Sequence, residues 1–148
     1  EQSGATACVC VVLGETIYTI NMGDARAVLA RGSAAVRLSE DHKPSGWAEE
    51  RRVRKAGGFV TNEGRVMGRL AVSRCFGDLE MRPLISDTPD ITQHQLQPED
   101  HFVVLACDGI WDVTSDRMAV SLCRPHVDDS CDFAALKLRD HAYFSTSL

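Results

Sequence analysis

The stretch Val103–Val113, "VVLACDGIWDV", joins an apolar run to a carboxylate at its end. The run from Val103 to Ala106 is typical of a buried strand, and the turn residues Cys107-Asp108-Gly109 follow it directly. An isolated buried charge is heavily penalised unless a partner or a metal ion compensates it. Two interpretations of Asp108 therefore stay open: a carboxylate in a surface turn, or a carboxylate that meets a cation at the end of a buried strand.

The composition fits one globular domain with a core of its own. The chain has 148 residues, of which 44% are hydrophobic and 25% are charged, and its formal net charge is −5. This charge provides no positive field for nucleic acid or an anionic membrane. No apolar run of about 18 residues or more predicts a membrane segment, and the amino-terminal residues lack a signal-peptide pattern. We expect an intracellular protein, cytoplasmic or nuclear, without a nucleic-acid partner; the oligomeric state is unknown at this stage.

Six cysteines are an even number, which would suit three disulfides in a small secreted scaffold. Most of them lie in apolar or helical patterns, and none forms a CxxC pair. We therefore predict reduced thiols that pack in the core, and we do not expect a structural zinc site. The cysteines are Cys8, Cys10, Cys75, Cys107, Cys123 and Cys131.

The pattern of strands and helices predicts an α+β fold. Residues 5–39 divide into short β-rich runs separated by turn residues, which is the spacing of an antiparallel meander. Two more strands are expected on either side of a turn at residues 98–100. The expected helices are Trp47–Ala56, closed by Gly57-Gly58; a second one capped by Thr114 or Ser115 that ends before Pro125; and a third capped by Ser130 that extends to about Tyr143.

Four loops carry an aspartate beside a glycine or another polar residue. Each loop alone is more typical of turn chemistry than of catalysis, because Asp and Gly favour turns. A site for hard cations needs oxygen ligands that converge in space, which spacing alone does not show. A structural β-sandwich with acidic turns therefore stays open as an alternative. The loops are Gly23-Asp24-Ala25-Arg26, Asp41-His42-Lys43-Pro44, Phe76-Gly77-Asp78 and Cys107-Asp108-Gly109.

The order of these loops carries more information than any one of them. The phrases are GDAR at 23–26, LSEDHKP at 38–44, ERRVRKAGG at 50–58, GRVMGRLAVSRCFGD at 64–78 and FVVLACDGIWDV at 102–113. In this order and spacing they strongly resemble the metal-dependent protein serine/threonine phosphatases of type 2C, the PPM family. The resemblance extends from about Ser3 to Tyr143.

The resemblance implies a fold and an activity. The implied fold is a pair of packed antiparallel sheets flanked by helices, an αββα sandwich, which in this chain is incomplete at both ends. Residues 1–148 would form part of the phosphatase domain, with a flap-like segment at about residues 44–70. The implied activity is hydrolysis of phosphoserine and phosphothreonine in phosphorylated proteins, by a water held between two Mg²⁺ or Mn²⁺ ions.

The resemblance also assigns metal ligands to individual positions. Asp108 matches an aspartate that binds one of the two core metal ions, and Asp24 matches an aspartate at a further, weaker metal position. For Asp24, an aspartate that bonds the amides of a hairpin turn is an equally good interpretation. Asp112 either accepts hydrogen bonds from the groups around the metal ion without binding the ion itself or, more simply, is a turn residue.

Two further residues have a functional and a structural interpretation. Arg74 would either reach phosphate or, more simply, pair with Asp78 or another loop carboxylate. His42 would either act as an acid or support the fold of its loop. For the basic helix face from Arg51 to Lys55, the alternatives are a surface for acidic partners and an ordinary solvated face.

Parts of the family's active site are absent from this chain. These are a phosphate-binding arginine, an Asp-Gly-His-Gly loop whose aspartate bridges the two metal ions, and a later Asp-Asn phrase. The catalytic residues are therefore unknown, and we expect the isolated chain to fold poorly and to show little or no activity. The alternative function is a truncated pseudophosphatase that binds phosphoproteins or a regulator.

Overall fold

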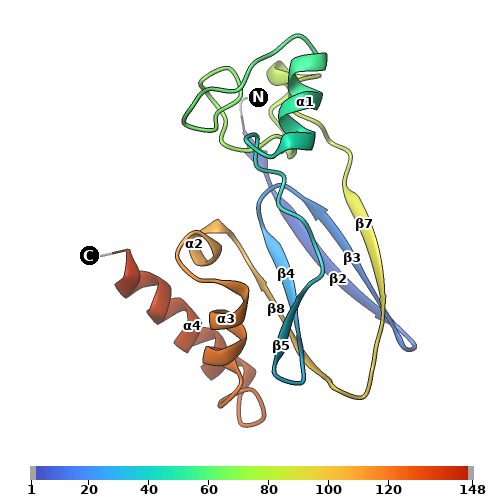
Figure 1. Cartoon of the computed structure of the whole chain (residues 1–148), viewed down its shortest axis with the longest axis vertical. Coiled ribbons are helices and arrows are strands. Elements are labelled where there is room, and N and C mark those ends of the chain that lie inside the picture. Colours follow the sequence, from blue (N-terminus) through green and yellow to red (C-terminus); the bar gives the residue numbers. More distant parts are fainter. Residues whose placement is uncertain (1–2, 147–148) are drawn as a thin grey trace.

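The computed structural model describes residues 3–146, which form two three-stranded antiparallel sheets, a small two-stranded sheet of β1 and β6, and a layer of helices (Figure 1). One sheet has the order β2-β3-β7 and the other the order β5-β4-β8. The elements are β1 (Gly4–Ala5), β2 (Ala7–Leu13), β3 (Thr16–Met22), β4 (Arg26–Arg31), β5 (Ala34–Arg37), α1 (Trp47–Lys55), β6 (Phe76–Gly77), the 3-10 helix η1 (Leu79–Met81), β7 (Asp90–Gln95), β8 (Asp100–Ala106), α2 (Asp108–Trp111), α3 (Asp116–Cys123) and α4 (Cys131–Ser145).

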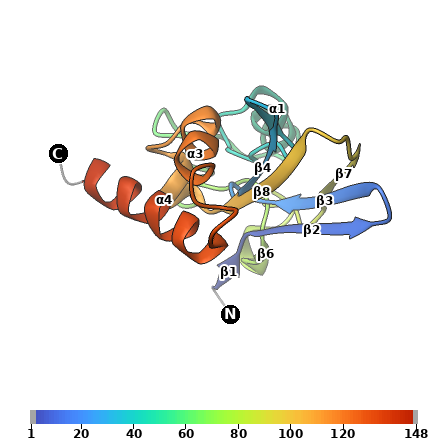
Figure 2. The same cartoon turned by 90° about the horizontal axis from the view of Figure 1, so that it is seen from below.

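Strand β4 is the centre of the molecule because both of its faces are buried. Ala27 and Leu29 belong to the core between the two sheets, and Val28 and Ala30 belong to the core between the second sheet and the helices. This alternation follows from the period of two along a strand. Helices α3 and α4 lie on one side of the sandwich (Figure 2), and α2 contacts β8 and α4 there. The predicted α+β fold with two antiparallel sheets and flanking helices is confirmed.

The predicted continuous meander over residues 5–39 is wrong. Strands β2 and β3 form a hairpin in one sheet, and β4 and β5 form a hairpin in the other. The chain changes sheet at the turn after β3, where Gly23 has a φ of 110°. A side chain there would meet the methyl group of Thr6 at 2.2 Å, so the crossing requires glycine.

Strands β7 and β8 also lie in different sheets, although they follow each other in the sequence. Strand β7 pairs with β3, and β8 pairs with β4. The two strands and the turn between them were predicted, and the structure confirms both strands. Their separation was not predicted, because the length and chemistry of a turn do not reveal which sheet receives the next strand.

The predicted helices and caps agree well with the structure. Helix α1 ends at Lys55, and Gly57 follows with a φ of 90°. Ser115 accepts a hydrogen bond from the amide of Met118, and Ser130 accepts one from the amide of Phe133. Each of the six cysteines is a free thiol. Within residues 3–146, no helix is long and apolar enough to cross a membrane.

A second small core lies at one end of the sandwich, around α1 (Figure 1). Its buried members are Val53, Val66, Cys75, Met81 and Ile85. Helix α1 contributes its inward face to this core, while the segment after it forms turns and isolated bridges. The flap-like segment at residues 44–70 therefore packs against the segment from Cys75 to Ile85; its role as a flap stays a prediction.

The core between the sheets leads to a stability prediction. Leu29 is 1% exposed, so replacement by Ala leaves a cavity between the two sheets. We expect Leu29→Ala to lower the free energy of unfolding by about 3 kcal/mol, measured by urea denaturation. Leu13→Ala is the matched control, because Leu13 is 63% exposed, and it should cost less than about 1 kcal/mol. Equal losses in the two variants would contradict the assigned core.

Candidate metal centre at the turn between β3 and β4

Asp108 lies at the surface and not at the end of a deeply buried strand. Strand β8 ends at Ala106, and Asp108 is the first residue of α2. Val104 is buried, but Leu105 is 46% exposed and Asp108 is exposed as well. Among residues 3–146, the Asp108 carboxylate has no hydrogen-bond or ion-pair partner. The expectation of a buried strand was wrong here, and the carboxylate is open to solvent.

Asp24 occupies a different environment in the buried turn between β3 and β4. Its side chain is 8% exposed, and Oδ2 accepts a hydrogen bond from Lys43 Nζ at 3.1 Å. The same Nζ donates to Oδ1 of Asp112 at 3.2 Å. Two carboxylates from distant parts of the sequence therefore converge on one cationic group. Burial alone would lower the pKa of Lys43, but the hydrogen bonds and charges of Asp24 and Asp112 outweigh it and raise that pKa.

Asp112 links the ion pair of Asp24 and Lys43 to Asp108, the other candidate metal ligand. Its amide donates a hydrogen bond to the carbonyl oxygen of Asp108 at 2.8 Å, so the two aspartates are one helical turn apart. Asp112 is the residue that ends α2, and its side chain is 60% exposed. Helix α2 thus places one carboxylate beside Asp24 and Lys43 and a second one nearby on the surface.

His42 holds the turn that carries Asp24. The amide of Gly23 donates to Nδ1 of His42 at 3.0 Å, and the amide of His42 donates to the carbonyl oxygen of Gly23 at 2.8 Å. The acceptor role of Nδ1 leaves the proton on Nε2, which donates to Oδ2 of Asp90 at 3.1 Å. The imidazole is 3% exposed. The fold-supporting interpretation of His42 is therefore the one that its contacts favour.

A buried carboxylate, Glu49, stabilises the other side of this loop. It accepts hydrogen bonds from Arg74 at 2.7 Å and from the hydroxyl of Ser73 at 2.7 Å, and Arg52 pairs with it at 3.1 Å. Burial alone would raise the pKa of Glu49, but these donors and charges lower it to about 2. Arg74 also pairs with Asp90 at 2.7 Å, and through it joins the His42 network.

These contacts decide the interpretation of Arg74, and they show that one residue of the basic face of α1 has a structural role. Arg74 is engaged by the carboxylates of Glu49 and Asp90, so the salt-bridge interpretation holds, although Asp78 is not among its partners. Arg52 from the basic face of α1 points inward and donates to the carbonyl oxygen of Ser73 at 2.7 Å. That face is therefore partly structural.

A second ion-pair cluster joins the sheet to the helices behind Asp112. Arg26 binds both carboxylate oxygens of Asp41, at 2.8 and 2.5 Å, and pairs with Asp116 at 2.5 Å. Its guanidinium lies 4.9 Å from the centre of the Trp111 ring. Trp111 in turn donates from Nε1 to the carbonyl oxygen of Ala106 at 2.8 Å. Arg26 thus holds α2, and with it Asp108 and Asp112, against β4.

The donor set suits a hard divalent cation. Mg²⁺ is often bound by one or two carboxylates together with several waters, and Mn²⁺ prefers similar oxygen ligands. Asp24 and Asp112 supply two such carboxylates that already meet at one cationic group. In the described part of the chain, no three or more His, Cys, Asp or Glu side chains are grouped as a metal site. The residues therefore fit a cation held by two carboxylates and water, not a closed cage of protein ligands.

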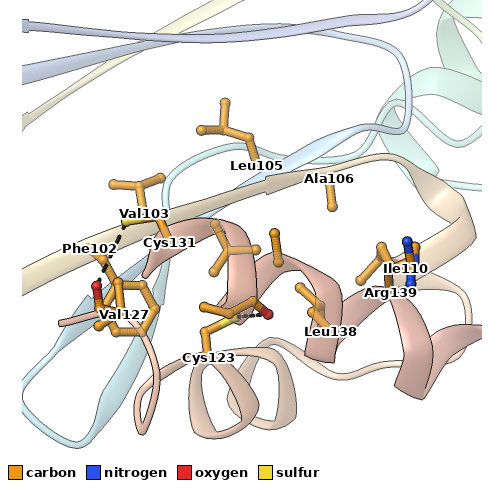
Figure 3. Close-up of a pocket in the computed structure, with 13 residues that line it drawn as sticks. Phe102, Val103, Leu105, Ala106, Ile110, Cys123, Val127, Cys131, Leu138 and Arg139 are labelled. Atoms are coloured by element: carbon orange, nitrogen blue, oxygen red, sulfur yellow. Dashed lines mark hydrogen bonds between the residues drawn. The ribbon is translucent and has the colours of Figure 1, made fainter. Parts of the chain in front are cut away.

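An apolar groove lies elsewhere, between β8 and the helices α3 and α4 (Figure 3). Its volume is about 470 Å³, and apolar side chains such as Val103, Leu105 and Leu138 line it. Among the described residues that line it, Arg139 is the only charged one. Among the described residues, its lining contains no histidine or carboxylate and no group of three potential metal ligands, so the groove is not the candidate catalytic site.

Comparisons with known proteins identify the class. A family model described as protein phosphatase 2C matches residues 1–147, and the chain belongs to this family. It is 44% identical over 133 residues to protein phosphatase 2C homolog 2 of Hypocrea jecorina, covering 84% of this chain and 30% of that protein. It is 40% identical over 145 residues to probable protein phosphatase 2C 45 of Oryza sativa subsp. japonica, covering 97% of this chain and 51% of that protein. The chain thus spans about half or less of the length of these relatives.

Solved structures support the same fold. A sex-determining protein of C. elegans matches with a TM-score of 0.87 and 31% identity, over 97% of this chain and 38% of that one. A serine-threonine phosphatase 2C from Toxoplasma gondii matches with a TM-score of 0.82, over 94% of this chain and 52% of that one. The second match has 22% identity and shows the fold alone.

The sequence reasoning did not single out Lys43 or Glu49. Lys43 lies in the phrase DHKP, and nothing in the spacing indicates that a lysine after β5 reaches an aspartate before β4. Glu49 lies in the first turn of α1, where an acidic residue simply complements the helix dipole. Only the packing of α1 against the segment around Ser73 shows that this carboxylate is buried.

The Glu49 network predicts a pH dependence of stability. Because its pKa is lowered from 4.5 to about 2, the stabilisation is fully present above pH 4.5 and is lost as the pH falls towards 2. Glu49→Gln should lower the free energy of unfolding by up to about 3 kcal/mol at pH 7, and the difference from the unmodified protein should shrink between pH 4.5 and 2. Urea denaturation at a series of pH values measures this difference.

The neighbouring Glu50→Gln variant is the control for this series. Glu50 pairs with Arg54 at 2.6 Å on the outer side of the helix, so its loss should cost less than about 1 kcal/mol. A Glu49→Gln variant as stable as Glu50→Gln at pH 7 would rule out the buried network as a major source of stability.

Proposed function

We propose that this chain is part of a metal-dependent protein serine/threonine phosphatase, with Mg²⁺ or Mn²⁺ as its cofactor. Membership of the protein phosphatase 2C family supports the class of reaction. The observation that carries the metal dependence is the convergence of Asp24 and Asp112 on one cationic position. The proposed substrates are proteins that carry phosphoserine or phosphothreonine.

The proposed roles of the acidic residues follow from their positions. Asp108, exposed at the start of α2, has its carboxylate available for one of the core metal ions. Asp24 would bind a cation at the further position, and its contact with Lys43 favours this over the simple turn interpretation. The bound metal would supply a water activated for attack on phosphorus and would neutralise phosphate charge.

The other charged residues of the region act on the fold rather than on substrate. The guanidinium groups of Arg26 and Arg74 are each engaged by two carboxylates, which leaves them poorly suited to bind phosphate. They position α2 and the turn between β3 and β4. We propose that the groups that bind phosphate and bridge the core metal ions belong to other parts of the whole protein, as the family resemblance implies.

The proposed function is tested on the protein expressed with its flanking coding sequence. We expect hydrolysis of a phosphothreonine peptide that depends on added Mn²⁺ or Mg²⁺ and stops with a chelator. Asp108→Asn should reduce kcat/KM at least about 100-fold, because an electrostatic contribution to the transition state is lost. Phosphate release measured across a metal titration gives both results.

Asp128→Asn is the matched control, because Asp128 is exposed in the loop between α3 and α4. It should retain full activity, and circular dichroism should show both variants folded. If the folded protein hydrolyses nothing in the presence of metal, or if Asp108→Asn keeps its activity, the enzymatic proposal is wrong. Binding of the phosphopeptide without turnover would then favour the pseudophosphatase alternative.

A further inference from the structure

Lys43 occupies the place where a divalent cation would meet Asp24 and Asp112. Its ammonium lies 3.1 Å from one carboxylate oxygen and 3.2 Å from the other. One positive charge thus serves two negative ones. The group is short of positive charge, which a divalent ion would supply.

The ammonium and a divalent ion cannot hold the same two oxygens together. A Mg²⁺ ion contacts its oxygen ligands at about 2.1 Å, well inside the distances at which the ammonium sits here. A cation bound between Asp24 and Asp112 would therefore lie within a few ångströms of Nζ, and the two positive groups would repel each other. Binding requires the ammonium to leave.

Lys43 is able to leave without disturbing the fold. Its side chain is 35% exposed, so the flexible stem has a route to solvent. The backbone beside it is held independently, because His42 exchanges two hydrogen bonds with Gly23 and Pro44 is buried. The side chain can swing out while Asp24 keeps its position.

We propose that Lys43 is a tethered competitor of the divalent cation at Asp24 and Asp112. This rests on the proposed function in one respect, that Asp24 is a cation ligand. In the metal-free protein the ammonium keeps the two carboxylates from repelling each other. Each binding event must first displace the ammonium. The apparent association constant for the ion therefore equals the intrinsic constant multiplied by the fraction of molecules in which the ammonium has already left.

The test measures metal binding rather than activity. Lys43→Met keeps most of the side-chain volume and removes the charge. The protein with its flanking sequence is titrated with Mn²⁺ by calorimetry. In Lys43→Met, the dissociation constant of the binding phase that depends on Asp24 should fall by about three- to tenfold, the range expected for the loss of two partly exposed ion pairs. Lys43→Arg keeps a positive charge and should not show this gain.

Thermal unfolding gives a second readout. Without metal, Lys43→Met should unfold at a lower temperature than the unmodified protein, because two carboxylates then face each other. Saturating Mn²⁺ should raise the midpoint temperature of unfolding by more in Lys43→Met than in the unmodified protein. Lys55→Met is the matched control, because Lys55 is exposed at the end of α1, and it should change neither the Mn²⁺ affinity nor the metal-induced shift.

Asp24→Asn assigns the gain to this position. Combined with Lys43→Met, it should abolish the tighter phase. Unchanged, weaker or undetectable Mn²⁺ binding at this position in Lys43→Met, or a gain that persists with Asp24→Asn, would overturn the inference. If the inference fails while Asp108→Asn still abolishes turnover, the proposed function stands. If Lys43→Met binds Mn²⁺ more tightly but no protein hydrolyses phosphopeptide, the proposed function fails and the inference stands.

Discussion

The buried turn between β3 and β4 is the constraint on which the rest of the structure depends. At this turn the chain leaves one sheet and enters the other, so its backbone polar groups lie away from water and need partners inside the protein. His42 meets this need by exchanging hydrogen bonds with both the amide and the carbonyl group of Gly23. Because Asp24 is the next residue, the hydrogen bonds that hold Gly23 in the fold also position the carboxylate of Asp24.

The acidic residues around this turn fall into two groups according to their partners. Glu49, Asp41, Asp90 and Asp116 are each paired with at least one arginine, at distances of 2.9 Å or less. A guanidinium that binds through a rigid fork is difficult to displace, so these pairs are suited to hold the fold. Among residues 3–146, Asp24 and Asp112 are paired only with the ammonium of Lys43, and the Asp108 carboxylate has no ion-pair partner. The carboxylates with exchangeable partners are the ones that we assign to metal binding.

The two ion-pair clusters have complementary effects on the candidate site. Arg26 fixes α2 against β4 from one side, through Asp116, Asp41 and the ring of Trp111. Arg74 and Glu49 fix the loop that carries His42 and Lys43 from the other side. The elements that bring Asp112 and Asp24 together are thereby held by arginine ion pairs, while the lysine between them has a side chain that is 35% exposed. A rigid pair of ligands with a movable cation is a reasonable basis for weak, reversible metal binding.

The sequence predicted the elements of this fold better than their assembly. Ser115 and Ser130 cap helices as expected, because a cap depends on residues that are neighbours in the chain. The placement of β3 and β4 in different sheets was missed, because it depends on burial of β4 on both faces. Asp24 and Asp108 were predicted as metal residues only through a family resemblance, and their ligand roles stay predictions. The convergence of Asp24, Lys43 and Asp112 depends on a tertiary contact that no local pattern records.

The most direct test of this account is a crystal structure of the protein with its flanking sequence, grown with Mn²⁺ and measured at a wavelength where manganese scatters anomalously. The account predicts an anomalous peak between the carboxylates of Asp24 and Asp112, with the side chain of Lys43 turned towards solvent. A structure in which manganese is bound elsewhere in the protein while Lys43 still bridges Asp24 and Asp112 would contradict it.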